Sequence, residues 1–130
     1  MELIHIPMSP GELLDKITIL EIKSERMSDE VKLANVRTEL KLLQDTWAAA
    51  VTEDDTVRRL HRELKAVNEK LWEIEDDIRD KERAREFDDR FIELARAVYY
   101  TNDDRAAAKK ALNLHLGSTI VEEKSYADYT

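Results

Sequence analysis

The sequence has no cysteine and very little glycine, proline or aromatic residue. Its 130 residues include two glycines and two prolines, and aromatic side chains make up 6% of the chain. The absence of cysteine excludes disulfide bonds and thiolate metal sites. Because residues that form tight turns are so scarce, we expect long helices joined by short connections. A chain of this length is expected to form one domain with its own hydrophobic core.

The balance of charge is acidic. Charged residues make up 38% of the chain, and the formal net charge is −8 at pH 7. Phosphate backbones and anionic membranes attract clustered positive charge, so neither nucleic acid nor an anionic membrane is an expected partner. No apolar run approaches the roughly 20 residues of a membrane span, and the opening "MELIHIPMSP" lacks the basic region and apolar core of a signal peptide. We therefore expect a cytoplasmic protein without membrane insertion.

The start of the first helix is the sharpest local signal. In "MSPGELL", Ser9 is a good helix cap, Pro10 suits the first helical position, and Glu12 completes a capping box. These residues predict a helix over 10–27, preceded by an extended arm over 1–8. Apolar residues fall on two sides of this helix, so we expect other helices to surround it.

Two longer helical patterns follow. Residues 29–51 and 54–84 each carry apolar residues at alternating steps of three and four, the seam of helices that pack side by side. Because the connection between them is short and acidic, the two are predicted to form an antiparallel hairpin. The apolar pattern stops after Ile78 and resumes at Phe87, which places a bend or loop near residues 85–88.

The C-terminal third predicts two shorter helices and a tail. A helix is expected over 88–101, the letters "TNDD" then offer a new cap, and a last helix is expected over 103–116. Gly117 is expected to end it in the left-handed conformation, and the tail covers 118–130. Together these patterns predict an all-α fold: an elongated helical bundle built on a long antiparallel helical hairpin, with short extended N- and C-terminal arms.

One acidic stripe is a candidate metal site. On a helix, spacings of four, three and four residues align the carboxylates of Glu69, Glu73, Asp76 and Asp80, and hard cations such as Mg²⁺ prefer several carboxylate oxygens. The alternative is a solvated face whose carboxylates pair with basic residues. We favour the alternative and expect no cofactor, because a metal site of this kind needs a second acidic helix, and the sequence offers no clear one.

A polar cluster near "ELARAVYYTNDDRAAAKKALN" is a candidate anion site. Arginine suits the bidentate capture of a carboxylate or phosphate. The alternative, which we favour, is that the tyrosines are half-buried anchors and the arginines pair with the acidic stripe. The residues of this candidate site are Arg96, Tyr99, Asn102, Arg105 and Lys109.

The order of several sequence stretches resembles a known family. "SPGELLDKITILEIKSERM", "LWEIEDDIRDKE", "FIELARAVYYTNDDRAAAKKALN" and "GSTIVEEKSY" occur here in that order. As a set they resemble a family of short bacterial and phage proteins, the family of unknown function DUF6165, over about residues 9–126. The resemblance brings no catalytic residue with it, because the family has no assigned activity. It implies an association with glycosyltransferase-like and surface-polysaccharide proteins.

The segment that matches "GSTIVEEKSY" is characteristic of that family, so we expect the tail to dock on the helices. In one mode of docking, Ile120 and Val121 pack beside the N-terminal arm as a short two-stranded pairing. In the other, the charged residues 122–124 neutralise basic residues of the bundle while Tyr126 covers its end. Fraying is the alternative for the residues after Tyr126.

The sequence offers more large apolar side chains than one hairpin can cover, so we expect self-association as a homodimer, or binding to a protein partner. The residues expected at interfaces or docking contacts are Leu64, Leu71, Trp72, Ile78, Ile120, Val121 and Tyr126. The leading hypothesis is a non-enzymatic, dimeric helical interaction or accessory protein, linked to surface-polysaccharide or glycosyltransferase systems. The alternative is a small helical metal-dependent enzyme that acts on a phosphorylated or dianionic metabolite.

Overall fold

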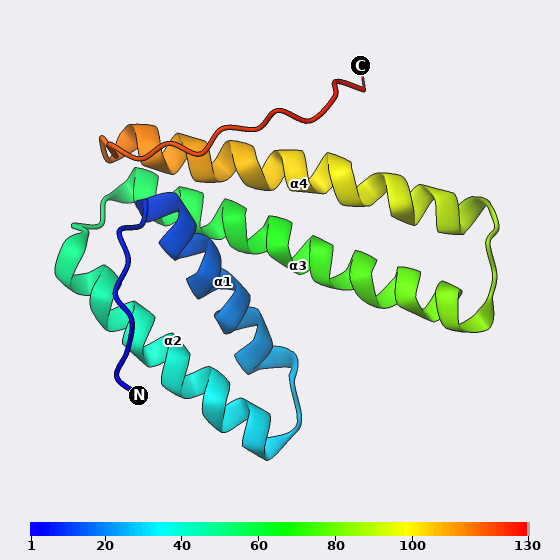
Figure 1. The fold of residues 1–130 in the computed structure, drawn as a ribbon, viewed down its shortest axis with the longest axis horizontal. Coiled ribbons are helices and arrows are strands. Elements are labelled where there is room, and N and C mark those ends of the chain that lie inside the picture. The colour runs from blue at the N-terminus through cyan, green and yellow to red at the C-terminus, as the bar shows by residue number, and fades with distance from the viewer. Residues whose placement is uncertain (130) are drawn as a thin grey trace.

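The fold is all-α, as the sequence predicts. The computed structural model describes residues 1–129 and contains four helices, with no strand among those residues (Figure 1). The last residue of the predicted tail, Thr130, lies outside the described residues. Within residues 1–129, no helix combines the length and the apolar character that crossing a membrane requires. The helices are α1 (Pro10–Arg26), α2 (Glu30–Ala50), α3 (Asp55–Ala84) and α4 (Asp89–His115).

The helices begin and end at the residues that local chemistry favours. The Ser9 hydroxyl accepts a hydrogen bond from the Glu12 backbone N–H at 3.2 Å, and the carboxylates of Asp54 and Asp88 cap α3 and α4 in the same way. Each cap satisfies a backbone donor that has no partner inside its helix. Between α3 and α4, Arg85 takes the left-handed conformation with φ of 55°. The break predicted near residues 85–88 is therefore present.

The predicted break between 88–101 and 103–116 is wrong, because α4 runs without interruption from Asp89 to His115. The cap-forming letters "TNDD" are only a local preference, and tertiary packing overrides it. Thr101 is 1% exposed inside the helix, while the Asp103 carboxylate binds the C-terminal tail instead of capping a helix. Gly117 does take the left-handed conformation after the helix, with φ of 66°.

The helices form two hairpins, α1–α2 and α3–α4, and α1 connects them. α1 packs against each of the other three helices, as its two apolar sides predict. α2 packs on α1, and α3 packs along α4, so the predicted pairing of residues 29–51 with 54–84 is not found. Helical seams do not specify their partner, and the connections on both sides of α2, at 27–29 and 51–54, are short enough for a hairpin. The two hairpins diverge from a common end, so the far half of the α3–α4 hairpin extends beyond α1 (Figure 1).

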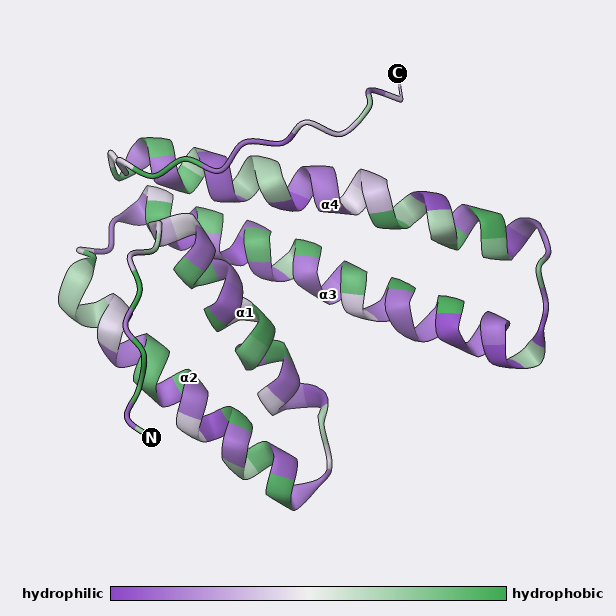
Figure 2. Ribbon diagram, in the orientation of Figure 1, coloured by the Kyte–Doolittle hydropathy of each residue, from purple (hydrophilic) through white to green (hydrophobic). Residues whose placement is uncertain are grey.

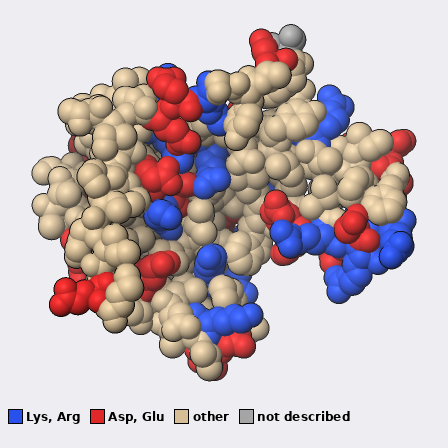
Figure 3. Space-filling view, viewed as in Figure 1, with Lys and Arg blue, Asp and Glu red and all other residues tan. Residues whose placement is uncertain are grey.

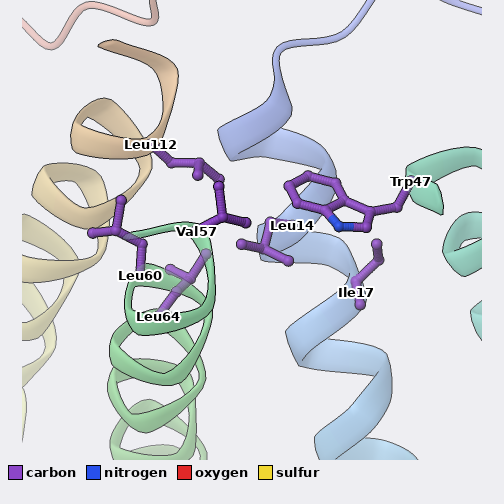
Figure 4. Close-up of a cluster of buried hydrophobic side chains, with 7 residues drawn as sticks. All are labelled: Leu14, Ile17, Trp47, Val57, Leu60, Leu64 and Leu112. Carbon is purple, nitrogen blue, oxygen red and sulfur yellow. The ribbon is translucent and has the colours of Figure 1, made fainter. Parts of the chain in front are cut away.

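The core lies at the end where all four helices meet. Figure 4 shows the buried cluster, to which Trp47 brings the C-terminal end of α2. The Trp47 indole N–H reaches a carboxylate oxygen of Glu53 at 3.1 Å, so its polar atom is satisfied at the edge of the cluster. Hydrophobic and hydrophilic residues alternate along every helix in Figure 2, as the heptad-like seams require. The cluster consists of Leu14, Ile17, Trp47, Val57, Leu60, Leu64 and Leu112.

Candidate functional site

A buried carboxylate lies at the centre of a polar network between α1, α3 and α4. Asp15 is 1% exposed, and its Oδ1 accepts hydrogen bonds from Arg105 Nε and Asn68 Nδ2, each at 2.9 Å. Arg105 Nη2 binds the other oxygen, Oδ2, which makes the pair bidentate. Asn68 also reaches the hydroxyl of Thr18 at 2.9 Å. Every buried side-chain nitrogen and oxygen of residues 1–129 has a hydrogen-bond partner.

The environment keeps Asp15 ionised. Burial raises the pKa of the Asp15 carboxyl, but the hydrogen bonds from Arg105 and Asn68 and the charges of Arg105 and Lys109 outweigh it, so the pKa lies below its ordinary value. The hydrogen bonds to the Asp15 carboxylate raise the pKa of Arg105 by more than burial lowers it. The pKa of Arg105 therefore lies above its ordinary value. This network therefore carries a fixed ion pair at the junction of three helices.

Lys109 is a second cation held beside this pair. Its side chain is 12% exposed, and its Nζ lies 2.7 Å from Glu12 Oε2 and 3.7 Å from Asp15 Oδ2. A third carboxylate, that of Glu122 in the C-terminal tail, lies 3.1 Å from the same nitrogen. Burial lowers the pKa of Lys109, but the bonds to Glu12 and Glu122 raise it by more than burial lowers it. The pKa of Lys109 therefore lies above its ordinary value. Lys109 thus joins α1, α4 and the tail.

The tail runs back along α4 in an extended conformation (Figure 1). Besides Glu122, two of its residues bind Asp103: Lys124 Nζ lies 3.2 Å from Oδ1, and the Tyr129 hydroxyl donates to Oδ2. The Tyr129 ring also packs against Tyr99 and Tyr100, with ring centroids 5.0 and 4.8 Å apart. The tail is therefore attached to α4 at Lys109 and again at Asp103.

Neither predicted mode of tail docking matches these contacts in full. No strand forms within residues 1–129, so Ile120 and Val121 do not pair with the N-terminal arm as strands. Ile120 is 46% exposed and Val121 is half-buried. In the second mode Glu122 does neutralise a lysine, but Lys124 binds an acid, and Tyr126 is 86% exposed. Tyr129, and not Tyr126, packs its ring on α4.

A cavity of about 880 Å³ lies between α4 and the tail. Its volume falls in the range of small-molecule sites. Four of the five residues predicted to bind an anion line this cavity: Tyr99, Asn102, Arg105 and Lys109. Most of the predicted polar cluster therefore faces one space. The fifth, Arg96, lies outside the lining, with its guanidinium 6.0 Å from the centre of the Tyr100 ring. The charges of Arg105 and Lys109 are already paired with carboxylates of the chain itself.

The acidic stripe of α3 pairs with arginines instead of converging. Arg26 Nη2 lies 3.6 Å from Glu69 and 3.5 Å from Glu73, and Asp80 pairs with Arg83 at 2.5 Å. Asp76 lies on the lining of a separate groove. Among residues 1–129, no three histidine, aspartate or glutamate side chains are grouped so that they could hold a metal ion. Figure 3 shows acidic and basic side chains intermixed at the free end of the α3–α4 hairpin.

The groove lies in the angle between α1 and the α3–α4 hairpin and has a volume of about 440 Å³; we call it the hairpin groove. Its apolar lining includes Ile19, Ile22, Leu71 and Trp72, and its rim carries charges of both signs. Of the residues predicted at an interface, Leu71, Trp72 and Ile78 are half-buried. Leu64 is 1% exposed in the chain's own core, which excludes it as an interface residue.

Sequence reasoning missed Asp15 and its partners on the other helices. The signal was present on the first helix, where Gly11, Asp15, Thr18 and Ile22 follow steps of four, three and four. A small residue and two polar ones on a stripe of an otherwise apolar helix indicate close, hydrogen-bonded contact with a neighbour. In the structure Gly11 N–H donates to Asn113 Oδ1 at 2.7 Å. No pattern in the sequence names Asn68 or Asn113 as the partners.

Comparison with known proteins shows which family the chain belongs to. The model of the family of unknown function DUF6165 matches residues 4–129, nearly the whole chain. The chain is therefore a member of this family, in agreement with the resemblance of its ordered sequence stretches. Neither the curated proteins nor the solved structures gave a match.

Proposed function

We propose that the protein is a non-enzymatic interaction module that acts as a homodimer, in which the hairpin groove is covered by a second copy. The observation that supports this proposal is the position of Trp72. This large side chain is half-buried in a groove that the chain's own helices leave open. Tryptophan in such a position is enriched among the residues that dominate binding energy at interfaces.

The charges around the groove suit a contact between two copies. A two-fold dimer places the same surface on both sides, so that surface must be complementary to itself. The rim carries Arg79 together with Glu75 and Asp76. Arg79 lies 3.1 Å from Glu75 in the same chain; the Arg79 side chain is 78% exposed and the Glu75 side chain 48%. Such a rim can exchange ion pairs with an identical rim, whereas a rim of one sign would repel it.

The N-terminal arm supplies apolar side chains that could fill such a groove. Leu3, Ile4 and Ile6 are 65%, 73% and 64% exposed, so the folded chain leaves them in water. The nine residues before α1 can span at most about 30 Å when extended. We place the arm of the second copy in the hairpin groove, where it would cover Leu71 and Trp72. The groove would in turn remove the apolar residues of the arm from water.

The test is the molecular mass in solution, measured by light scattering after size-exclusion chromatography over a range of concentrations. We expect the wild type to reach twice the monomer mass and a Trp72→Glu variant to remain monomeric, because a carboxylate cannot be desolvated in an apolar contact. Val31→Glu is the matched control, because Val31 is 74% exposed on α2, away from the groove. Ile4→Glu should weaken the dimer as well.

A monomeric wild type at every concentration would rule the dimer out, and so would a Trp72→Glu variant that stays dimeric with an unchanged circular dichroism spectrum. The proposed link to surface-polysaccharide or glycosyltransferase systems has a separate test. A complex between the purified chain and a glycosyltransferase from the same cell should be measurable by the same light-scattering method, and no complex would count against the link.

A further inference from the structure

The cavity between α4 and the tail is lined by a cation and an anion that both belong to α4. Lys109 lies near one end of the contact with the tail, and Asp103 lies near the other. We infer that this cavity binds a linear zwitterion, such as an ω-amino carboxylate or a short peptide with free ends. Its carboxylate would bind Lys109, and its ammonium group would bind Asp103.

Lys109 is a prepared carboxylate site. A lysine ammonium group has three N–H donors; one faces Glu12 at 2.7 Å, and Glu122 of the tail lies on another side at 3.1 Å. Two carboxylates of α1, those of Glu12 and Asp15, hold the ammonium group independently of the tail. A ligand carboxylate that replaces Glu122 would meet a cation that needs no rearrangement.

Asp103 provides the opposite end. Its two carboxylate oxygens accept hydrogen bonds from Lys124 and from the Tyr129 hydroxyl, both in the tail. Its side chain is 47% exposed, so a ligand can approach it from solvent. The ligand ammonium group would replace Lys124, while Tyr129 can keep its hydrogen bond to the other oxygen. Between the two ends, Ala106 lines the cavity and would contact a methylene chain, while Tyr99 lines the cavity one turn before Asp103.

The tail itself indicates the length of the ligand. Lys109 and Asp103 are six residues apart on α4, which corresponds to about 9 Å along the helix axis. The tail spans this interval with a carboxylate and an ammonium group from Glu122 and Lys124, whose backbone positions lie about 7 Å apart in an extended chain. A ligand whose charged ends are about 7–9 Å apart would reproduce both contacts at once.

The charges of the network favour a single carboxylate over a dianion. Without Glu122, the cations Arg105 and Lys109 face the two carboxylates of Glu12 and Asp15, so the network is already neutral. A dianionic ligand would therefore bring charge that nothing in the network compensates. One carboxylate in place of Glu122 leaves the charge as it is now. The tail then acts as an internal competitor, since Glu122 must leave Lys109 and Lys124 must leave Asp103 before the ligand binds.

The experiment titrates the full chain with 8-aminooctanoate, 6-aminohexanoate and 4-aminobutanoate and follows the amide resonances of α4 and the tail by NMR. Octanoate and octylamine, which each carry one of the two charges, are the controls. We expect 6-aminohexanoate, whose extended ends match this distance, and 8-aminooctanoate, which reaches it when bent, to shift these resonances in a saturable manner, and the shortest amino acid to bind more weakly. Glu122→Gln should raise the affinity about two- to fivefold, because it weakens the competing ion pair.

Two further variants test the two ends of the site. Lys109→Met should abolish binding, and Asp103→Asn, which changes an exposed side chain, should reduce 8-aminooctanoate to the affinity of octanoate. A merely structural role of the tail would not make the Glu122→Gln variant bind more tightly. The inference is overturned if no amino acid binds to Glu122→Gln, if octanoate binds as well as 8-aminooctanoate, or if Asp103→Asn binds like the wild type. None of these results depends on whether the chain is a dimer through the hairpin groove.

Discussion

Arg105 and Asp15 are 90 residues apart in the chain, and two nitrogens of the Arg105 guanidinium bind the two oxygens of the Asp15 carboxylate. The pair fixes the middle of α4 against the first half of α1. Because Asp15 is 1% exposed, its charge must be compensated inside the protein. The same arginine lines both the cavity beneath the tail and the hairpin groove, so one ion pair holds the wall between the two spaces.

Replacing Asp15 by Asn should strongly destabilise the fold. The variant leaves Arg105 without a buried counter-ion, and breaking a buried pair in this way costs roughly 3–5 kcal/mol. Since the Arg105 side chain is 30% exposed, solvent offsets part of that loss, and we expect about 2–4 kcal/mol. Urea unfolding followed by circular dichroism measures it. Asp45→Asn, which removes an exposed pair with Lys41, should cost less than about 0.5 kcal/mol.

The same carboxylate makes stability depend on acid pH. The pKa of Asp15 is lower in the folded chain than its ordinary value of 3.8, so the folded state binds this proton less tightly than the unfolded state does. The contribution is complete above the ordinary pKa and is lost as the pH falls through the lower, folded value. The difference in unfolding free energy between the wild type and Asp15→Asn should be constant between pH 5 and 7, roughly, and shrink below about pH 4. A difference that shrinks on the alkaline side of pH 7 instead would contradict this assignment.

The sequence predicts the helices better than it predicts their partners. Caps at Ser9 and the break at 85–88 depend on neighbours in the chain, and both are present. The choice of α1 as the partner of α2, and the contact of Asp15 with Arg105, depend on residues far away. A seam of apolar residues shows only that a helix packs, and many helices offer a matching seam. Tyr99 and Lys109 line one cavity although the sequence predicts a helix break between them, and the contacts of the tail that borders this cavity are not predicted from the sequence.

A methyl group at Gly11 should disturb the contact of α1 with α4. A Cβ at this position would lie 2.5 Å from the Lys109 carbonyl oxygen and 2.8 Å from Asn113 Oδ1. Because the first atom belongs to the backbone of α4, the helices must move apart, and we expect Gly11→Ala to cost about 1–3 kcal/mol. The midpoint of thermal unfolding measures the loss. An unchanged midpoint would show that α1 and α4 do not approach this closely.

Gly117 should be sensitive to substitution for a different reason. No atom lies within 4 Å of a Cβ at this position, but the residue has φ of 66°. An alanine there fits in space and is strained in its backbone, which costs about 1–2 kcal/mol. Asparagine tolerates the left-handed conformation better, so Gly117→Asn should recover part of the stability that Gly117→Ala loses. At Gly11, where space is the constraint, asparagine should be worse than alanine.

The hydrogen bond that attaches the end of the tail should be visible in the titration of a tyrosine. The bond to the Asp103 carboxylate raises the pKa of Tyr129 from 10.0 to about 12, because ionisation would place two negative charges side by side. The ultraviolet absorbance of the phenolate, compared between the wild type and Tyr129→Phe, isolates this one group among the four tyrosines. We expect its titration near pH 12 in the wild type and closer to its ordinary value in Asp103→Asn.

The pKa of Tyr129 is higher in the folded chain than in the unfolded chain. The contribution of this bond to stability is therefore complete below roughly pH 10 and is lost as the pH rises through the folded value. If Tyr129 titrates at its ordinary value while the chain is still folded, this hydrogen bond does not attach the end of the tail to Asp103.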